Sequence, residues 1–145
     1  MFAMVKKTIF VFTLILLGAT IKAFPQLEQL QNICSLYFPP DFISDGQQYY
    51  APLKQDEVVE FRTTFYGENV YRIVACTNVK KGQLSFSVYD TEKNLLFSNE
   101  KYDYSPYWNF KFKSTVSCII RLKVNSERFQ PGYIMLLIGF QQPKL

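Results

Sequence analysis

Strict alternation of apolar and polar side chains is the feature that most constrains how this chain can fold. Over residues 56–66, Val59, Phe61 and Phe65 fall on one side, whereas Glu60 and other polar residues occupy the positions between them. Successive side chains of a β-strand point to opposite faces, so this period of two predicts a strand with one buried and one solvated face.

The same alternation recurs along the rest of the chain, with turn signals between the alternating segments. The further expected strands cover residues 70–77, 84–88, 95–97, 108–112, 116–124 and 133–140. The last of these is apolar at almost every position, which is typical of a central strand covered on both faces. Roughly seven or eight short strands predict an all-β chain that folds as an antiparallel β-sandwich of jelly-roll or Greek-key style.

A different period precedes the strands. Residues 25–38 carry apolar side chains at steps of three and four, as on the buried face of an amphipathic helix. The Pro39-Pro40 pair ends this pattern, and a turn-rich stretch follows up to Gly46. We therefore expect an N-terminal helix and linker over residues 24–40 and a single β-sandwich domain over residues 41–145.

Residues 1–23 have the composition of a secretory signal peptide. A segment with two lysines precedes an apolar run over residues 9–21, and the small Ala23 offers a cleavage site before Phe24. A run of about 13 residues is short for a membrane-spanning helix, which needs about 20. We expect the protein to be exported, either to the periplasm or out of the cell, with no membrane span after cleavage.

Charge and composition narrow the possible functions. The predicted signal peptide holds three of the sixteen basic residues and no acidic one, so its removal lowers the formal net charge from +4 to +1. The remainder has no basic cluster longer than Lys80-Lys81, so nucleic acid is not an expected partner. Histidine is absent, which excludes Ser-His-Asp catalysis and the commonest metal ligand. We expect no catalytic residue, cofactor or metal site.

Carboxylates leave one remote alternative, a glycan hydrolase that uses two acidic residues. Glu57 and Glu60 are three residues apart on an expected strand and would point to opposite faces. Asp90 and Glu92 lie in an expected turn, where Asp commonly bonds the backbone. These positions favour structural roles, so we expect no enzyme.

Aromatic residues between Tyr102 and Trp108 are the candidate ligand contacts. Tyr104, Tyr107 and Trp108 lie beside hydrogen-bonding side chains, and such rings stack on sugars or pack against proteins. Trp108 shares its strand parity with Phe110, which favours a place in the core. Tyr104 and Tyr107 then remain as surface contacts.

Three cysteines, Cys34, Cys76 and Cys118, allow three single disulfide bridges, and all three thiols could instead be reduced and buried. We favour the bridge between Cys76 and Cys118, because both lie in strand-like segments that could be neighbours. An oxidising compartment would preserve such a bridge.

Several segments carry a resemblance to known proteins. They are residues 59–67 (VEFRTTFYG), 71–76 (YRIVAC), 108–112 (WNFKF) with Ser114-Thr115, and 132–140. The chain resembles small exported β-sandwich proteins of unknown function that are common in Bacteroidota. More distantly, its strand order is similar to bacterial pre-peptidase C-terminal and GOLD domains, although residues 90–94 offer only part of the acidic turn typical of the former. The resemblance implies an accessory or binding module and transfers no catalytic residue.

These observations together predict a non-enzymatic exported module that contacts a protein or a surface glycan at the cell envelope. The alternative is a structural component of an envelope or extracellular assembly that docks through the N-terminal helix, because a helix of about three turns needs a surface to cover.

Overall fold

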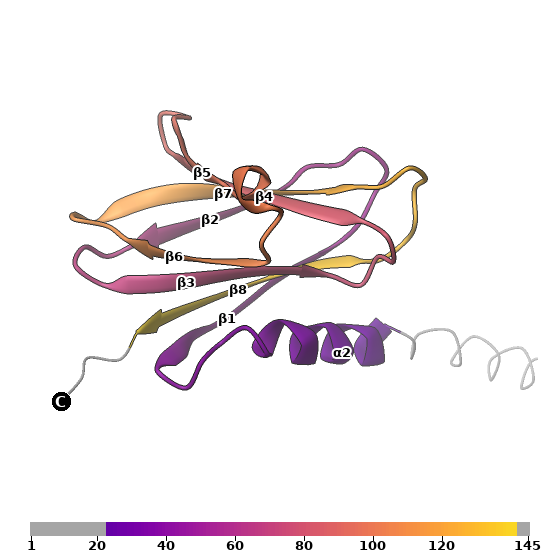
Figure 1. Ribbon diagram of the computed structural model, residues 1–145, viewed down its shortest axis with the longest axis horizontal. Coiled ribbons are helices and arrows are strands. Elements are labelled where there is room, and N and C mark those ends of the chain that lie inside the picture. Colours follow the sequence, from indigo (N-terminus) through magenta and orange to yellow (C-terminus); the bar gives the residue numbers. More distant parts are fainter. Residues whose placement is uncertain (1–22, 142–145) are drawn as a thin grey trace, which may run out of the picture.

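Two four-stranded antiparallel sheets face each other in the computed structural model, which describes residues 23–141 (Figure 1). The strands are β1 (Phe42–Pro52), β2 (Val59–Phe65), β3 (Val70–Thr77), β4 (Gln83–Asp90), β5 (Leu95–Ser98), β6 (Tyr107–Lys111), β7 (Val116–Asn125) and β8 (Tyr133–Gln141). The helix α2 (Ala23–Ser35) precedes them, and the 3-10 helix η1 (Asn99–Tyr102) follows β5. The predicted all-β sandwich with a short N-terminal helix is thus confirmed.

Most of the predicted signal peptide lies outside the described residues. Within residues 23–141, no helix is both long enough and apolar enough to cross a membrane.

The strand order is that of a jelly roll. Sheet A has the order β1-β8-β3-β6, and sheet B has the order β2-β7-β4-β5. Seven of the eight strands match the predicted segments, and β8 is central in its sheet, as its apolar sequence predicts. The first and last strands are neighbours, with Phe42 opposite Gln141. Eight strands divided between two sheets in this order fit the double Greek key of jelly rolls.

The core lies between the sheets and follows the alternation read from the sequence. Sheet A contributes Ile73 and Leu136, and sheet B contributes Phe65, Phe86 and Ile120, all with no exposed surface. Burying each such side chain stabilises the fold by about 1.5–3 kcal/mol relative to leaving it exposed. The two sheets are therefore held face to face mainly by the apolar side chains that the alternating sequence places on their inner faces.

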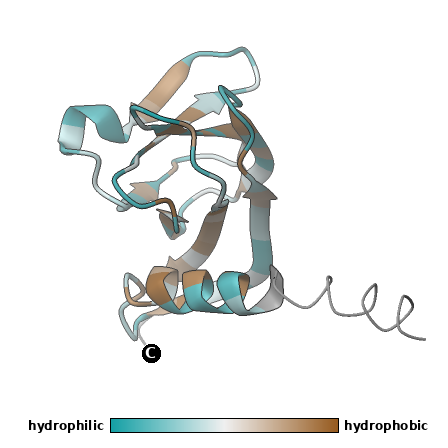
Figure 2. Cartoon of the chain, turned by 90° about the vertical axis from the view of Figure 1, so that its right-hand side faces the viewer, coloured by the Kyte–Doolittle hydropathy of each residue, from teal (hydrophilic) through white to brown (hydrophobic). Residues whose placement is uncertain are grey.

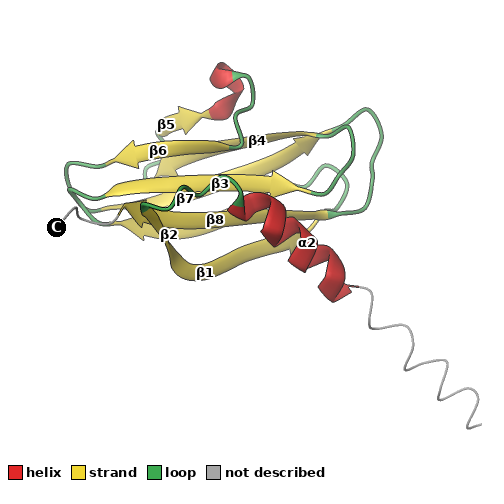
Figure 3. Ribbon diagram, turned by 60° about the horizontal axis from the view of Figure 1, so that its bottom comes forward, coloured by secondary structure: helices red, strands yellow, loops and turns green. Residues whose placement is uncertain are grey.

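Helix α2 covers the outer face of sheet A, as Figures 2 and 3 show from two directions. Leu30 on the helix is fully buried against Val74 and Leu137 on the strands beneath it. The chain after Ser35 continues in tighter turns, and the Phe38 ring lies over β8 at Gly139. A β-carbon at Gly139 would lie 2.5 Å from the Phe38 ring, so the missing side chain makes this contact possible.

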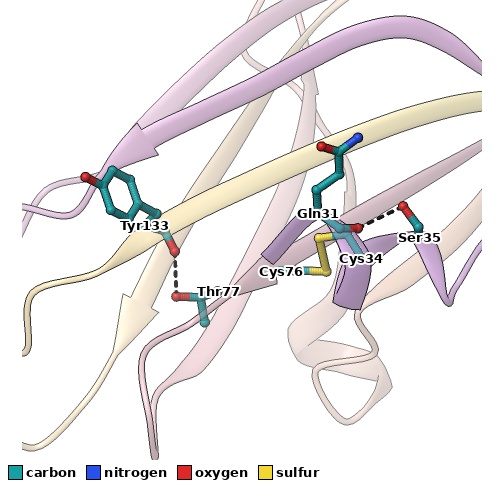
Figure 4. Close-up of a disulfide and its surroundings, with 6 residues drawn as sticks. All are labelled: Gln31, Cys34, Ser35, Cys76, Thr77 and Tyr133. Carbon is teal, nitrogen blue, oxygen red and sulfur yellow. Dashed lines mark hydrogen bonds between the residues drawn. A yellow bond between two sulfur atoms is a disulfide. The ribbon is translucent and has the colours of Figure 1, made fainter. Parts of the chain in front are cut away.

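The disulfide joins this helix to sheet A and corrects the predicted pairing. Cys34 is bridged to Cys76 on β3, with their Cα atoms 5.8 Å apart (Figure 4). Cys118 is a free, buried thiol. The predicted bridge between Cys76 and Cys118 is wrong because the two side chains occupy different layers. Cys76 points outward under α2 and Cys118 points into the sandwich.

One long side of the sandwich, where the edge strands β5 and β6 face each other, is closed by aromatic rings. The Phe97 ring lies 5.0 Å from both Trp108 and Phe110, and the Tyr102 ring lies 4.2 Å from Trp108. These tilted and edge-to-face ring pairs each contribute about 0.5–1.5 kcal/mol beyond the effect of the area that they bury. The opposite long side, between β1 and β2, is not closed in this way and contains a groove.

A buried amide holds η1 against the core. Asn99 has no exposed surface; its Oδ1 accepts from the backbone N–H of Phe86, and its Nδ2 donates to the carbonyls of Leu84 and Ser105. Three bonds satisfy the buried side chain, which would otherwise be costly to bury.

Candidate functional site

A groove of about 620 Å³ opens on the long side of the sandwich formed by the edge strands β1 and β2. Its apolar lining comes from Tyr71, Ile138 and Phe140 of sheet A and Phe65 of sheet B. The polar lining residues are Asp45, Gln47, Arg62, Thr63, Thr64 and Asn69. A wider depression of about 850 Å³ near residues 81–83 and 123–127 has no aromatic lining, so the groove is the better candidate for a specific ligand.

A β-bulge in β1 shapes this groove. The pairing of β1 with β8 shifts register between Ser44 and Gln48, and Gly46 adopts a left-handed φ of 79°. The side chain of Asp45 accepts from the backbone N–H of Gln47 at 2.9 Å. Because a bulge inserts an extra residue and re-aims its neighbours, Asp45 lines the groove instead of following the alternation of the strand.

The bulge explains why part of β1 was predicted as a turn. Asp45 and Gly46 are turn residues by type, and the structure places them inside a strand that begins at Phe42. The same acidic stretch, with Asp41, carries two carboxylates in the weak pattern of a calcium loop. Within residues 23–141 there is no cluster of three or more possible metal ligands, and Asp41 accepts from the Gln141 amide.

Two of the residues that line the groove are charged and have no ion-pair partner among residues 23–141. Neither Asp45 nor Arg62 takes part in any of the salt bridges found there. Burial raises the pKa of Asp45 above its ordinary value, and the bond from the Gln47 N–H acts in the opposite direction. A half-buried carboxylate with oxygen lone pairs to spare is a ready acceptor for the hydroxyl groups of a ligand.

Tyrosine rings border the groove beside these charges. The Tyr49 ring lies 5.4 Å from Phe61, and its hydroxyl donates to the Gln47 side chain. Tyr66 is 63% exposed, while its backbone N–H donates to the Tyr71 hydroxyl at 3.0 Å. The groove therefore has one ring anchored in the sandwich and one ring largely open to a ligand.

No known protein family model and no curated protein matches this chain. The groove is thus interpreted from its own residues, which come from four strands and the turn between β2 and β3. Sequence reasoning missed it because these residues are scattered along the chain. The one local sequence signal for the groove is the Asp45-Gly46 pair followed closely by Tyr49.

The three predicted ligand contacts do not share one surface. Tyr107 and Trp108 are adjacent on β6 and point to opposite faces of sheet A. Trp108 packs against the core, as its parity predicts, while Tyr107 is 37% exposed and lies 4.5 Å from the guanidinium of Arg72. Tyr104 is half-buried in a turn, where its backbone N–H donates to the Asn99 carbonyl.

Three of the four carboxylates considered for glycan hydrolysis are engaged in contacts within the fold, namely Glu57, Glu60 and Asp90. Glu60 pairs with Arg121 at 2.6 Å, and Glu57 lies 3.9 Å from Lys54. Asp90 accepts from the backbone and side-chain N–H groups of Asn94, each at 2.8 Å, which lowers the pKa of Asp90. These contacts tie the carboxylates to neighbouring strands and turns.

The free thiol of Cys118, by contrast, has no exposed surface. Burial, with a smaller contribution from the charge of Asp90, raises the pKa of this thiol to about 11. The thiolate is the reactive form, so Cys118 is a poor nucleophile at neutral pH and serves as a small core residue.

Proposed function

We propose that this protein is an exported, non-enzymatic binding module that holds a carbohydrate chain in the groove between β1 and β2. The observation that carries the proposal is the combination, in one groove, of tyrosine rings with two charged residues that have no ion-pair partner among residues 23–141. Sugars present apolar C–H faces that stack on rings, and hydroxyl groups that bond to carboxylates, amides and guanidinium groups.

The size of the groove supports a small segment of glycan. Its volume of about 620 Å³ falls within the roughly 300–1,000 Å³ that is typical of small-molecule sites. The exposed ring of Tyr66 would provide the stacking face, while Asp45 and Arg62 would bond the hydroxyl groups from β1 and β2. The predicted signal peptide supports a place of action at the envelope, where such glycans are found.

Docking of the N-terminal helix on another protein is less well supported. The apolar side of α2 is already buried on sheet A through Leu30 and Cys34, and the disulfide fixes the helix there. A protein is the alternative ligand for the same groove. The experiment below distinguishes a protein ligand from a glycan.

The first experiment is a glycan array probed with the folded, disulfide-bonded protein, followed by calorimetric titration with the best oligosaccharide. Tyr66→Ala removes an exposed ring, and Asp45→Asn keeps the shape of the side chain while removing its charge. We expect each variant to weaken binding about tenfold or more, since loss of one stacking or charged contact is worth about 1.4 kcal/mol or more.

The matched control is Tyr50→Ala. Tyr50 follows Tyr49 on β1, is 51% exposed and does not line the groove, so its removal should leave affinity unchanged. An empty array combined with a protein captured from the native envelope, whose binding Tyr66→Ala abolishes, would assign the groove to a protein ligand. Binding that survives both groove variants would refute the groove as the site.

A further inference from the structure

We propose that two copies of this chain associate through β2, edge to edge, so that their B sheets join into one continuous eight-stranded sheet. Strand β2 is the last strand of sheet B and pairs with β7 on one side only. Its other edge presents backbone N–H and C=O groups that have no strand partner among residues 23–141. This inference does not rest on carbohydrate binding.

Strand β2 is the edge best suited to such pairing. It keeps an unbroken one-to-one register with β7 over Val59–Phe65 and contains neither glycine nor proline. The other edges are interrupted or short: β1 carries the bulge, β5 has four residues and an irregular register, and β6 has five residues. Bulges and short length are two of the usual means of protecting an edge from pairing, and β2 has neither; charged side chains are a third, and those of β2, Glu60 and Arg62, are of opposite sign.

Strand parity and charge then select one register. In an antiparallel pair around a two-fold axis, opposed residues lie on the same face of the sheet, so Glu60, Arg62 and Thr64 of one copy face even-numbered positions of the other. An axis through residue 60 or through residue 62 would oppose like charges. An axis through Phe61 places Glu60 against Arg62 of the second copy, twice by symmetry.

This register completes contacts that one copy leaves open. Arg62 is exposed and forms no salt bridge within residues 23–141, while Glu60 already bonds Arg121 on the neighbouring strand. Pairing would extend the Arg121–Glu60 contact into a row of alternating charges across the joined sheets. Opposite charges on directly facing residues stabilise strand pairs, and like charges destabilise them. The surface is complementary to itself, which favours a second copy over a foreign extended peptide.

The test is sedimentation velocity of the disulfide-bonded protein with reversed charges. From about 10 μM to about 1 mM, where an association of a few kcal/mol is populated, we expect wild type to shift from monomer to dimer. Arg62→Glu and Glu60→Arg should each raise the dissociation constant about tenfold or more by opposing like charges. The double variant E60R/R62E restores opposite charges and should restore the dimer.

The control variant is Lys101→Glu, an exposed charge reversal in η1 on the opposite long side, which should leave dimerisation unchanged. Circular dichroism verifies that each variant is folded. The proposal is overturned if the wild-type protein stays monomeric up to 1 mM. It is overturned in the same way if the β2 edge pairs only with a foreign peptide and not with a second copy. A folded double variant that remains as weak as the single ones also overturns it, because rescue requires the Glu60–Arg62 contact. Arg62 also borders the groove, so oligomeric state is measured without glycan.

Discussion

Opening the bridge between Cys34 and Cys76 should cost this protein a large part of its stability. The bridge closes a loop with a sequence separation of 42 residues. In the chain-entropy account, a cross-link over a loop of this length removes about 13 cal/mol/K of entropy from the unfolded chain, or about 4 kcal/mol at 25 °C. Small domains are stable by only about 5–15 kcal/mol, so the reduced protein is expected to be marginal.

The assay is urea unfolding, followed by circular dichroism, of wild type and of the double variant C34A/C76A, each with and without a thiol reductant. With a denaturant dependence of about 2 kcal/mol per molar urea, wild type should lose about 2 M in its midpoint on reduction. The double variant should unfold at a low midpoint that the reductant does not change. Cys118 is present in both proteins, so the difference reports the bridge alone.

Two results would refute this reasoning. A non-reducing peptide map that links Cys76 with Cys118 would show that the layers of the sandwich have been assigned wrongly. A wild-type midpoint that is unchanged by complete reduction would show that packing of α2 through Leu30, and not the bridge, holds the helix on sheet A.

Three further predictions follow from buried or half-buried polar groups. Asn99→Ala should lower the free energy of unfolding by about 3 kcal/mol, because it leaves one buried and two partly buried backbone groups without a partner; urea unfolding measures this. In native protein at pH 8, Cys118 should resist alkylation that goes to completion in urea, as mass spectrometry would show, since its thiol is buried and has a pKa of about 11. Burial raises the pKa of Asp45 above 3.8 in the folded chain, so folding is favoured by protonation below pH 3.8, and this gain is lost as the pH rises through the folded pKa. Asp45→Asn should therefore exceed wild type in stability at pH 7, with the difference shrinking toward pH 4 in paired urea titrations.

The parts of the fold that the sequence predicts are those that depend on local alternation. Strand β7 carries Cys118, Ile120 and Leu122 on its buried face, and β2 carries Val59 and Phe65 on its own, so the period of two identifies both strands and their inner sides. The helix period is equally local. Its end differs, because the prediction runs to the prolines while α2 ends at Ser35 and tighter turns continue to Phe38.

The features that were missed depend on which face a strand turns to a distant element. Strand β3 is apolar on both faces, so its pattern does not reveal that Cys76 points toward α2 and away from the interior. The groove has the same origin: a bulge in β1 brings Asp45 close to residues of β2, which are paired in the other sheet. Neither fact is encoded within one segment.

The pairing of β1 with β8 has a consequence for how fast this chain folds. Residue 42 lies opposite residue 141, so sheet A is complete only after the first strand has paired with the last. Closing so long a loop costs conformational entropy before the contacts between β1 and β8 can stabilise the sheet. Sandwiches dominated by such distant pairs fold in milliseconds to seconds, not microseconds. Shortening the chain from its C-terminal side by one strand would remove the partner of β1 and one of the two partners of β3, so that β1 would be separated from the β3–β6 pair that remains of sheet A.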